Sequence, residues 1–161
     1  RIAGAATILA IDPLESKHAL AKKVGATHAC TPDQLPDAIQ TLTGGLGFDY
    51  GFEVVGKSAA IMTAWQATRR GGDVVIVGAG AMDDMVQLSA FQLLFDGKNI
   101  LSSLYGDADV RRDFPRFARM YQAGLLDLDS MISARITLDD LNDAVAALRS
   151  GEVLRQIVVF D

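Results

Sequence analysis

Short apolar runs alternate along the chain with segments that repeat apolar residues at helical spacing. Residues 7–11 and 73–77 are nearly continuous apolar runs, as expected of strands buried on both faces of a sheet. Between these two runs, the pattern predicts further short strands, over 27–31 and 48–54. It also predicts three helices: one that ends at Gly25, one over 35–42 and one over 59–68. The alternation predicts an α/β fold in which a doubly wound parallel sheet is covered by helices on both sides.

The pattern changes after Gly78. A loop is predicted over 79–86, a helix over 88–95, a strand over 98–104 and a long amphipathic helix over 108–123. The apolar residues of this last helix fall on one stripe, which consists of Val110, Phe114, Phe117 and Tyr121. Gly124 follows as the residue expected to end the helix.

The C-terminal part carries a further helix signal. Thr137 with Asp140 three residues later resembles a capping box and predicts a helix that begins there and ends at Gly151. A last strand is predicted over 155–160. Residues 105–161 therefore form a predicted α+β segment.

Composition narrows the classes of function. The chain has 161 residues, enough for a sizeable core, and its net charge of −5 argues against a nucleic-acid partner. No apolar run is long enough to span a membrane. The only cysteine, Cys30, cannot form an internal disulfide, which predicts a reducing, cytoplasmic location. With only His18 and His28 beside it, the chain cannot build a Cys/His zinc site. Because the chain begins at Arg1 without an initiator Met, we expect it to be a fragment.

Asp12 is the first candidate for chemistry. It follows a predicted strand, and in nucleotide-binding doubly wound folds a carboxylate in this place accepts hydrogen bonds from the adenosine ribose. A carboxylate also repels a 2′-phosphate, which favours NAD over NADP. The alternative is purely structural: Asp12 as the N-cap of a helix, with Pro13 at N1 and Glu15 at N3.

The Gly-rich phosphate loop that belongs to such a fold is not found in its place. It is expected about 20 residues before the acidic residue, and therefore upstream of Arg1. Gly78-Ala79-Gly80 follows a strand, but it leads into Asp83 and Asp84, whose carboxylates would repel a pyrophosphate.

Several segments, in order and with their spacing, resemble the zinc-type medium-chain alcohol dehydrogenases. They extend over the whole chain, and they are Ile11-Asp12 with Lys17, residues 23–27, Phe48-Asp49, residues 52–56, residues 72–78, Leu104-Tyr105-Gly106 and residues 148–155. The resemblance implies a partial NAD-binding Rossmann-type domain over 1–104, with its first strand and Gly-rich loop upstream. It also implies that residues 105–161 belong to the catalytic domain.

The resemblance also assigns roles to residues. Asp12 and Lys17 would bind the adenosine ribose, and Arg155 would reach the pyrophosphate, although Arg155 can equally be a solvated arginine. Val54, Val55 and Gly56 would form a wall beside the coenzyme at the end of their strand. Backbone groups of Val77, Gly78 and Ala79 would meet the nicotinamide carboxamide. Ser103, Leu104 and Tyr105 would lie on the opposite side. Lys57 stands where the family often has Arg, so no contact is assigned to it.

The resemblance implies hydride transfer between NAD and an alcohol or aldehyde, with zinc bound by residues outside this chain. We therefore expect the fragment to be inactive alone. In the family, the strand equivalent to 100–104 pairs with its twin in a homodimer, the alternative being an edge that the chain's own helix covers.

Two other functions remain open from the sequence. One is a zinc-independent, quinone reductase-like member of the same superfamily, which Asp12 disfavours. The other is a non-catalytic nucleotide-sensing Rossmann domain, which does not explain the tail from Ala108 onward.

Overall fold

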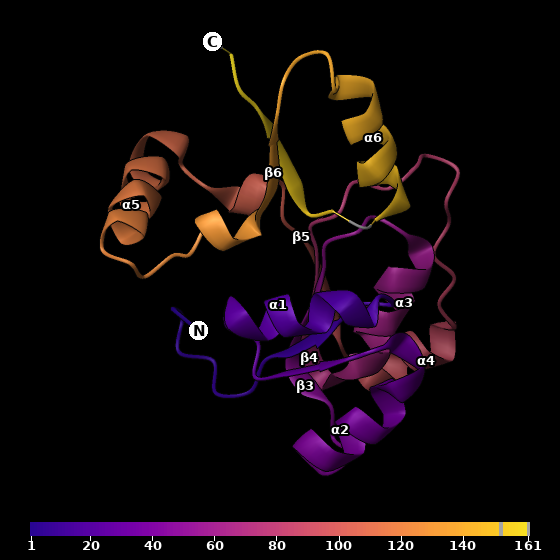
Figure 1. The fold of residues 1–161 in the computed structure, drawn as a ribbon. Helices are drawn as coiled ribbons and strands as arrows, with labels where there is room; N and C mark the ends of the chain where they lie inside the picture. Colours follow the sequence, from indigo (N-terminus) through magenta and orange to yellow (C-terminus); the bar gives the residue numbers. More distant parts are fainter. Residues whose placement is uncertain (152, 161) are drawn as a thin grey trace. The chain divides into compact units, whose positions relative to one another are not determined.

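The computed structural model describes residues 1–151 and 153–160, and its contacts divide the chain into two compact units. Unit 1 holds residues 3–108, and unit 2 begins at Asp109. The elements of unit 1 are β1 (Leu9–Ile11), α1 (His18–Lys23), β2 (His28–Cys30), α2 (Leu35–Thr43), β3 (Phe48–Glu53), α3 (Ser58–Ala67), β4 (Thr68–Ile76), α4 (Ala90–Asp96) and β5 (Asn99–Ser102) (Figure 1).

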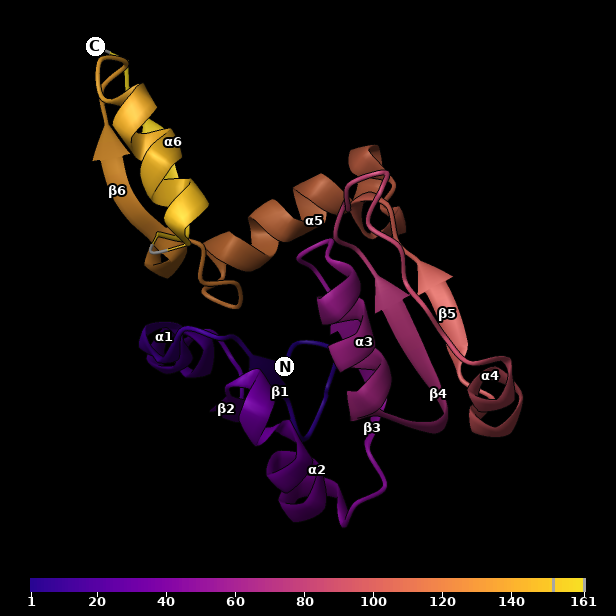
Figure 2. The same cartoon turned by 90° about the vertical axis from the view of Figure 1, so that its right-hand side faces the viewer.

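All strand pairs of unit 1 that the structure describes are parallel. β1 pairs with β2, and β3, β4 and β5 form a three-stranded sheet in that order. Figure 2 shows β4 and β5 side by side and running in the same direction. Parallel strands joined through helices confirm the predicted α/β, Rossmann-like fold.

One face of the three-stranded sheet packs against α3. Gly51 and Val74 are neighbours in the register and are both buried, and Val74 forms a core with Ala64 and Trp65 of the helix. Gly51 lets the helix approach: a Cβ there would lie 2.8 Å from the Ala64 carbonyl oxygen. The lack of a side chain on Gly51 and the compact side chain of Val74 therefore allow α3 to pack closely against β3 and β4.

The end of the same helix is held by Lys98. Its ammonium donates to the Trp65 carbonyl at 2.7 Å, lies 4.8 Å from the centre of the Trp65 ring and is 3.4 Å from an Asp96 carboxylate oxygen. A buried cation thus has both a carboxylate and a π-face as partners, which offsets its desolvation.

β4 begins earlier than the sequence predicted. Thr68, expected as the last helical residue, is its first residue and pairs with Phe48. Between the paired positions, the four residues 69–72 of β4 stand against the single residue Asp49 of β3, which is where the register shifts. Gly71, with φ of +68°, supplies the left-handed turn that this irregular stretch needs.

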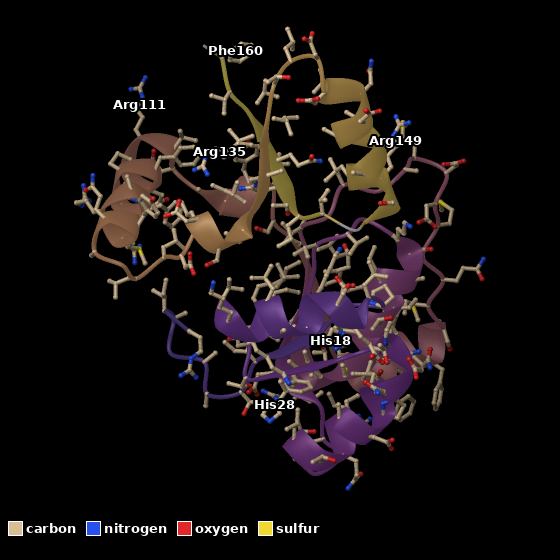
Figure 3. The ribbon with its side chains drawn as sticks, viewed as in Figure 1. His18, His28, Arg111, Arg135, Arg149 and Phe160 are labelled. Carbon is tan, nitrogen blue, oxygen red and sulfur yellow. The ribbon has the colours of Figure 1, made fainter. Side chains whose placement is uncertain are left out.

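Unit 2 contains α5 (Val110–Gln122), β6 (Ile132–Ile136), α6 (Leu141–Ser150) and β7 (Arg155–Val158), and β6 and β7 are parallel. Asp109 caps α5 by accepting from the backbone N–H groups of Arg111 and Arg112. Figure 3 shows Arg111 on α5, Arg135 on β6 and Arg149 on α6.

Two features of unit 2 differ from the prediction. One is β6, which the sequence analysis did not predict. The other is α6, which begins at Leu141, because the Asp140 carboxylate accepts from the N–H and hydroxyl of Thr137 and so closes a turn before the helix. The predicted apolar stripe of α5 is exposed, with exposed fractions of 40% to 52% for its four members, Val110, Phe114, Phe117 and Tyr121.

Candidate functional site

The last residue of β3, Glu53, joins the ends of two neighbouring strands. Its backbone oxygen accepts from the N–H groups of Val77 and Gly78, at 2.8 and 3.2 Å, just beyond β4. Its side-chain Oε1 accepts from the N–H groups of Val55 and Gly56, at 2.6 and 2.7 Å. The two predicted wall segments, 54–56 and 77–79, are therefore held together through one residue.

Two glycines allow these segments to touch backbone against backbone. Gly56 has φ of +78°, and a Cβ on it would overlap the Ala79 carbonyl oxygen and lie 2.5 Å from the carbonyl carbon. A Cβ on Gly78 would overlap the Gly56 nitrogen and lie 2.7 Å from the Val55 carbonyl carbon. Gly56 is buried and Gly78 partly buried in this contact, so a side chain at either position would separate the two segments. The predicted role of these segments as a coenzyme wall stays a prediction.

The third predicted segment joins the same edge. The N–H of Ser103 donates to the Ile76 oxygen at 2.9 Å, which places the end of β5 beside the end of β4. The side chains of Leu104 and Tyr105 are largely exposed. Tyr105 has φ of +55°, an uncommon conformation for a residue with a Cβ, so the chain turns sharply away from the sheet at this point.

Asp84 fixes the loop that follows β4. Its Oδ2 accepts from the Ser58 N–H at 2.8 Å, at the first residue of α3. The hydrogen bonds with Ser58 hold the pKa of Asp84 below its ordinary value. A carboxylate at a helix N-terminus is also favoured by the helix dipole. Both the strand ends and the loop beyond them are thus fastened to α3 and its preceding strand.

Asp12 lies at the end of β1, as predicted, where its N–H donates to the Cys30 oxygen of β2. Its Oδ1 accepts from the Leu14 N–H at 2.9 Å, and Oδ2 lies 3.8 Å from the Lys17 ammonium. Asp12 therefore closes a local turn. It is not the N-cap of the following helix, which begins at Glu15 after Leu14.

His18 supports the same turn from α1 (Figure 3). Its Nε2 is 2.9 Å from the Asp12 carbonyl oxygen. Because a carbonyl can only accept, this nitrogen carries the proton and donates. The turn therefore presents a partly exposed carboxylate next to one ammonium, a pair of groups suited to two neighbouring hydroxyls.

The predicted site residues thus fall into three places. Segments 54–56 and 77–79 and Ser103 share one sheet edge, while Asp12 and Lys17 form a separate pair at the end of β1. Arg155 is exposed at the start of β7 in unit 2, and its pyrophosphate contact stays a prediction. Glu152, part of the segment over 148–155, and Asp161 lie outside the described residues.

Sequence reasoning did not single out Glu53. The available signal was its position: the alternation of β3 places it on the same face as Gly51, opposite the exposed Tyr50 and Phe52. An acidic residue on the buried face of a strand needs a partner, and this need was the clue.

The side chains that could bind a metal ion do not cluster in the described residues. In the part of the chain that the structure describes, no group of three or more His, Cys, Asp or Glu side chains is placed to hold a metal ion. The residues present therefore do not fit a zinc ion, and Cys30 is free and buried. Within the described ranges, no helix combines the length and apolar character needed to cross a membrane.

Comparison with known proteins gives a consistent result. Residues 1–123 match the family model described as zinc-binding dehydrogenase. The NDMA-dependent alcohol dehydrogenase of Amycolatopsis methanolica is 32% identical over 161 residues, which are 98% of this chain and 43% of that protein. The chain therefore spans less than half the length of this relative.

Two solved structures extend the comparison. The benzyl alcohol dehydrogenase of Acinetobacter calcoaceticus superposes with a TM-score of 0.90 at 28% identity, over 99% of this chain and 44% of that one. A zinc-binding dehydrogenase of Sinorhizobium meliloti 1021, solved with NADP bound, gives a TM-score of 0.76 at 30% identity, over 91% of this chain and 43% of that one.

Proposed function

Since this chain belongs to the zinc-binding dehydrogenase family, we propose that it is the coenzyme-binding portion of an NAD-dependent alcohol dehydrogenase. The observation that carries the proposal is the joined strand edge, where Glu53 binds N–H groups of segments 54–56 and 77–79 and two glycines let the backbones of these segments touch. In parallel α/β sheets, ligands bind at the carboxyl ends of the strands. This edge is such an end.

The residues divide the coenzyme between them. Asp12 and Lys17 hold the adenosine ribose: the free acceptor capacity of the carboxylate takes the hydroxyls, and the ammonium donates to them. Val54, Val55 and Gly56 wall one side of the nicotinamide half, while peptide groups of Val77, Gly78 and Ala79 bind its carboxamide. Ser103, Leu104 and Tyr105 close the other side, and Arg155 binds the pyrophosphate.

The bound nicotinamide supplies the hydride acceptor for an alcohol or the hydride donor for an aldehyde. The chain's own contribution is to orient that ring and to keep it against the strand ends. Since the described residues do not fit a zinc ion, no metal step is assigned to them. We expect the 161-residue chain to bind coenzyme without oxidising alcohol.

The choice of NAD rests on Asp12. A zinc-binding dehydrogenase with a similar fold has been solved with NADP, so the fold alone does not decide between the two coenzymes. A 2′-phosphate in the place of the ribose hydroxyl would face the Asp12 carboxylate, which is only partly balanced by Lys17 at 3.8 Å. The proposal includes a cytoplasmic location, supported by the free Cys30.

Isothermal titration of the chain with NAD, NADP and ADP tests this function. Binding of NAD that is tighter than binding of NADP supports the proposal. Tight binding of ADP with no gain from the nicotinamide half favours a nucleotide sensor, and preference for NADP favours the quinone reductase-like alternative. No binding of any of the three refutes the proposed site.

The proposal also includes a homodimer formed through the edge strand 100–104. The observation behind it is that every residue of β5 is exposed, and the exposed fractions of Ile100, Leu101 and Leu104 are 46%, 46% and 83%. In the described part of the chain, β5 pairs with β4 alone. An apolar strand with an open edge invites pairing with a second copy. Light scattering that detects only monomer at micromolar concentration contradicts the dimer.

A further inference from the structure

Glu53 is buried more deeply than an ordinary carboxylate. Its exposed fraction is 2%, and while Oε1 accepts from two N–H groups, Oε2 has no hydrogen-bond partner among the described residues. Burial of a charged or polar group costs free energy unless its hydrogen-bonding capacity is filled. An apolar residue at this position would avoid that cost, but it would leave the N–H groups of Val55 and Gly56 without the acceptor that Oε1 provides.

The contacts of Oε1 show what the carboxylate provides. Val55 and Gly56 lie beyond the end of β3 at Glu53, and the N–H of Gly56, whose bond to Oε1 is buried, would otherwise lack this acceptor. Bonds to a carboxylate are shorter and stronger than bonds to a neutral acceptor, in keeping with the distances of 2.6 and 2.7 Å. Because the two donors follow Glu53 by only two and three residues, these bonds close a tight turn directly after β3.

This tight turn is what brings the two wall segments together. It gives Gly56 its left-handed conformation and presses it against Ala79, while the Glu53 backbone oxygen holds Val77 and Gly78 on the other side. We propose that Glu53 is a positioning residue, whose carboxylate sets the geometry of the peptide groups at 54–56 and 77–79 that bind the coenzyme. The inference rests on the proposed function and adds to it the residue that shapes the site.

The test compares three variants of the chain, Glu53→Gln, Glu53→Asp and Glu53→Ala. Gln keeps the reach and an acceptor oxygen, Asp is shorter by one methylene group, and Ala has no acceptor. Asp49→Asn is the matched control, because Asp49 lies on the same strand but is exposed and paired only with Arg69 at the surface.

Two quantities are measured for each protein at a temperature well below unfolding. The first is the dissociation constant for NAD, by titration calorimetry. The second is the hydrogen-exchange rate of the Val55 and Gly56 amides without coenzyme, by NMR. We expect Glu53→Ala and Glu53→Asp to weaken NAD binding about tenfold or more, as for the loss of two hydrogen bonds that order a binding loop. The same two variants should accelerate exchange of both amides, whereas Glu53→Gln restores most of both properties and Asp49→Asn changes neither.

The outcomes separate the inference from its premise. Faster exchange with an unchanged dissociation constant makes Glu53 a stability residue only and overturns the inference, as does unchanged exchange in Glu53→Asp. If the unaltered chain binds NAD but no Glu53 variant differs from it, the inference fails and the proposed function stands. If the unaltered chain binds no dinucleotide, both fail. Should Glu53→Ala not fold, the comparison of Asp with Gln decides alone.

Discussion

The contact between the two wall segments predicts how three glycines respond to substitution by alanine. Gly78 has an ordinary backbone conformation, but a Cβ on it would overlap the backbone of Gly56. Gly44, at the end of α2, is the opposite case, since its φ is +63° and no atom lies within 4 Å of a Cβ. Gly56 combines both conditions, with φ of +78° and an overlap with Ala79.

The structure lets the two costs be separated. Gly44→Ala places an L side chain in the left-handed region and should lower the free energy of unfolding by about 1–2 kcal/mol. Gly78→Ala leaves the backbone conformation allowed but forces the two strand ends apart. The added Cβ would overlap the Gly56 nitrogen and lie 2.7 Å from the Gly56 Cα, so the segments must separate by more than about 0.7 Å to reach ordinary contact at 3.4 Å. Overpacking against backbone costs about 1–3 kcal/mol. Gly56→Ala should exceed either one, at about 2–5 kcal/mol if the costs add.

Urea unfolding followed by circular dichroism measures the stabilities, and NAD titration measures the site. Gly44→Ala should leave the dissociation constant for NAD unchanged, because α2 contributes no residue to the proposed site. Gly78→Ala should weaken NAD binding about tenfold or more, since peptide groups displaced by more than about 0.5 Å lose hydrogen-bond geometry. If Gly78→Ala is as stable as the unaltered chain and binds NAD equally well, the backbone contact between the segments does not exist in solution.

Three further outcomes follow from individual contacts. Asp84→Asn should destabilise the chain at pH 7, and this effect should shrink as the pH falls through the lowered folded-state pKa of Asp84. The folded-state pKa of Asp84 is lowered, so its contribution is present above the unfolded value of about 3.9 and is lost as pH falls through the folded value, a trend that urea unfolding at several pH values detects. Asp12→Asn should reduce the preference for NAD over NADP about tenfold by titration, whereas the exposed Glu15→Gln should not change it. Asp109→Ala removes the N-cap of α5 and should cost about 1 kcal/mol in urea unfolding, with no change in NAD affinity.

The elements of unit 1 could be predicted because each was encoded locally. Buried parallel strands appear as apolar runs, and Gly44 ends its helix in the left-handed conformation that glycine adopts most easily. The start of β4 could not be predicted, because Arg69 to Gly72 has the composition of a turn and forms an irregular stretch between Thr68 and Asp73, which pair with β3. Strand pairing is a tertiary effect that the local sequence does not contain.

In unit 2 as well, the local sequence did not reveal features that depend on tertiary contacts. β6 spans only five residues, follows a turn-rich stretch and alternates half-buried with exposed positions, so its apolar signal is weak. The α5 stripe was read correctly as an apolar face, but periodicity reveals which residues share a face and not whether anything covers it. The pattern likewise predicted that Asp12 follows a strand. It did not predict that the Asp12 side chain accepts from the Leu14 N–H and closes a turn.

The proposed site is harder to read than the fold because its binding groups are mainly peptide groups. Val54 and Val55 expose their side chains. The N–H groups of Val55, Gly56, Val77 and Gly78 are bonded to Glu53, so the groups proposed to meet the coenzyme at 54–56 and 77–79 are mainly carbonyl oxygens, which every residue provides. Side-chain identity is therefore weakly constrained at most of these positions. It is strongly constrained only where the backbone geometry depends on it, at Gly56, at Gly78 and at Glu53. It follows that Val55→Ile, which keeps the backbone N–H and carbonyl groups, should affect coenzyme binding far less than Glu53→Ala, which removes the acceptor of two N–H groups. A site built in this way keeps its function while most of its side chains change.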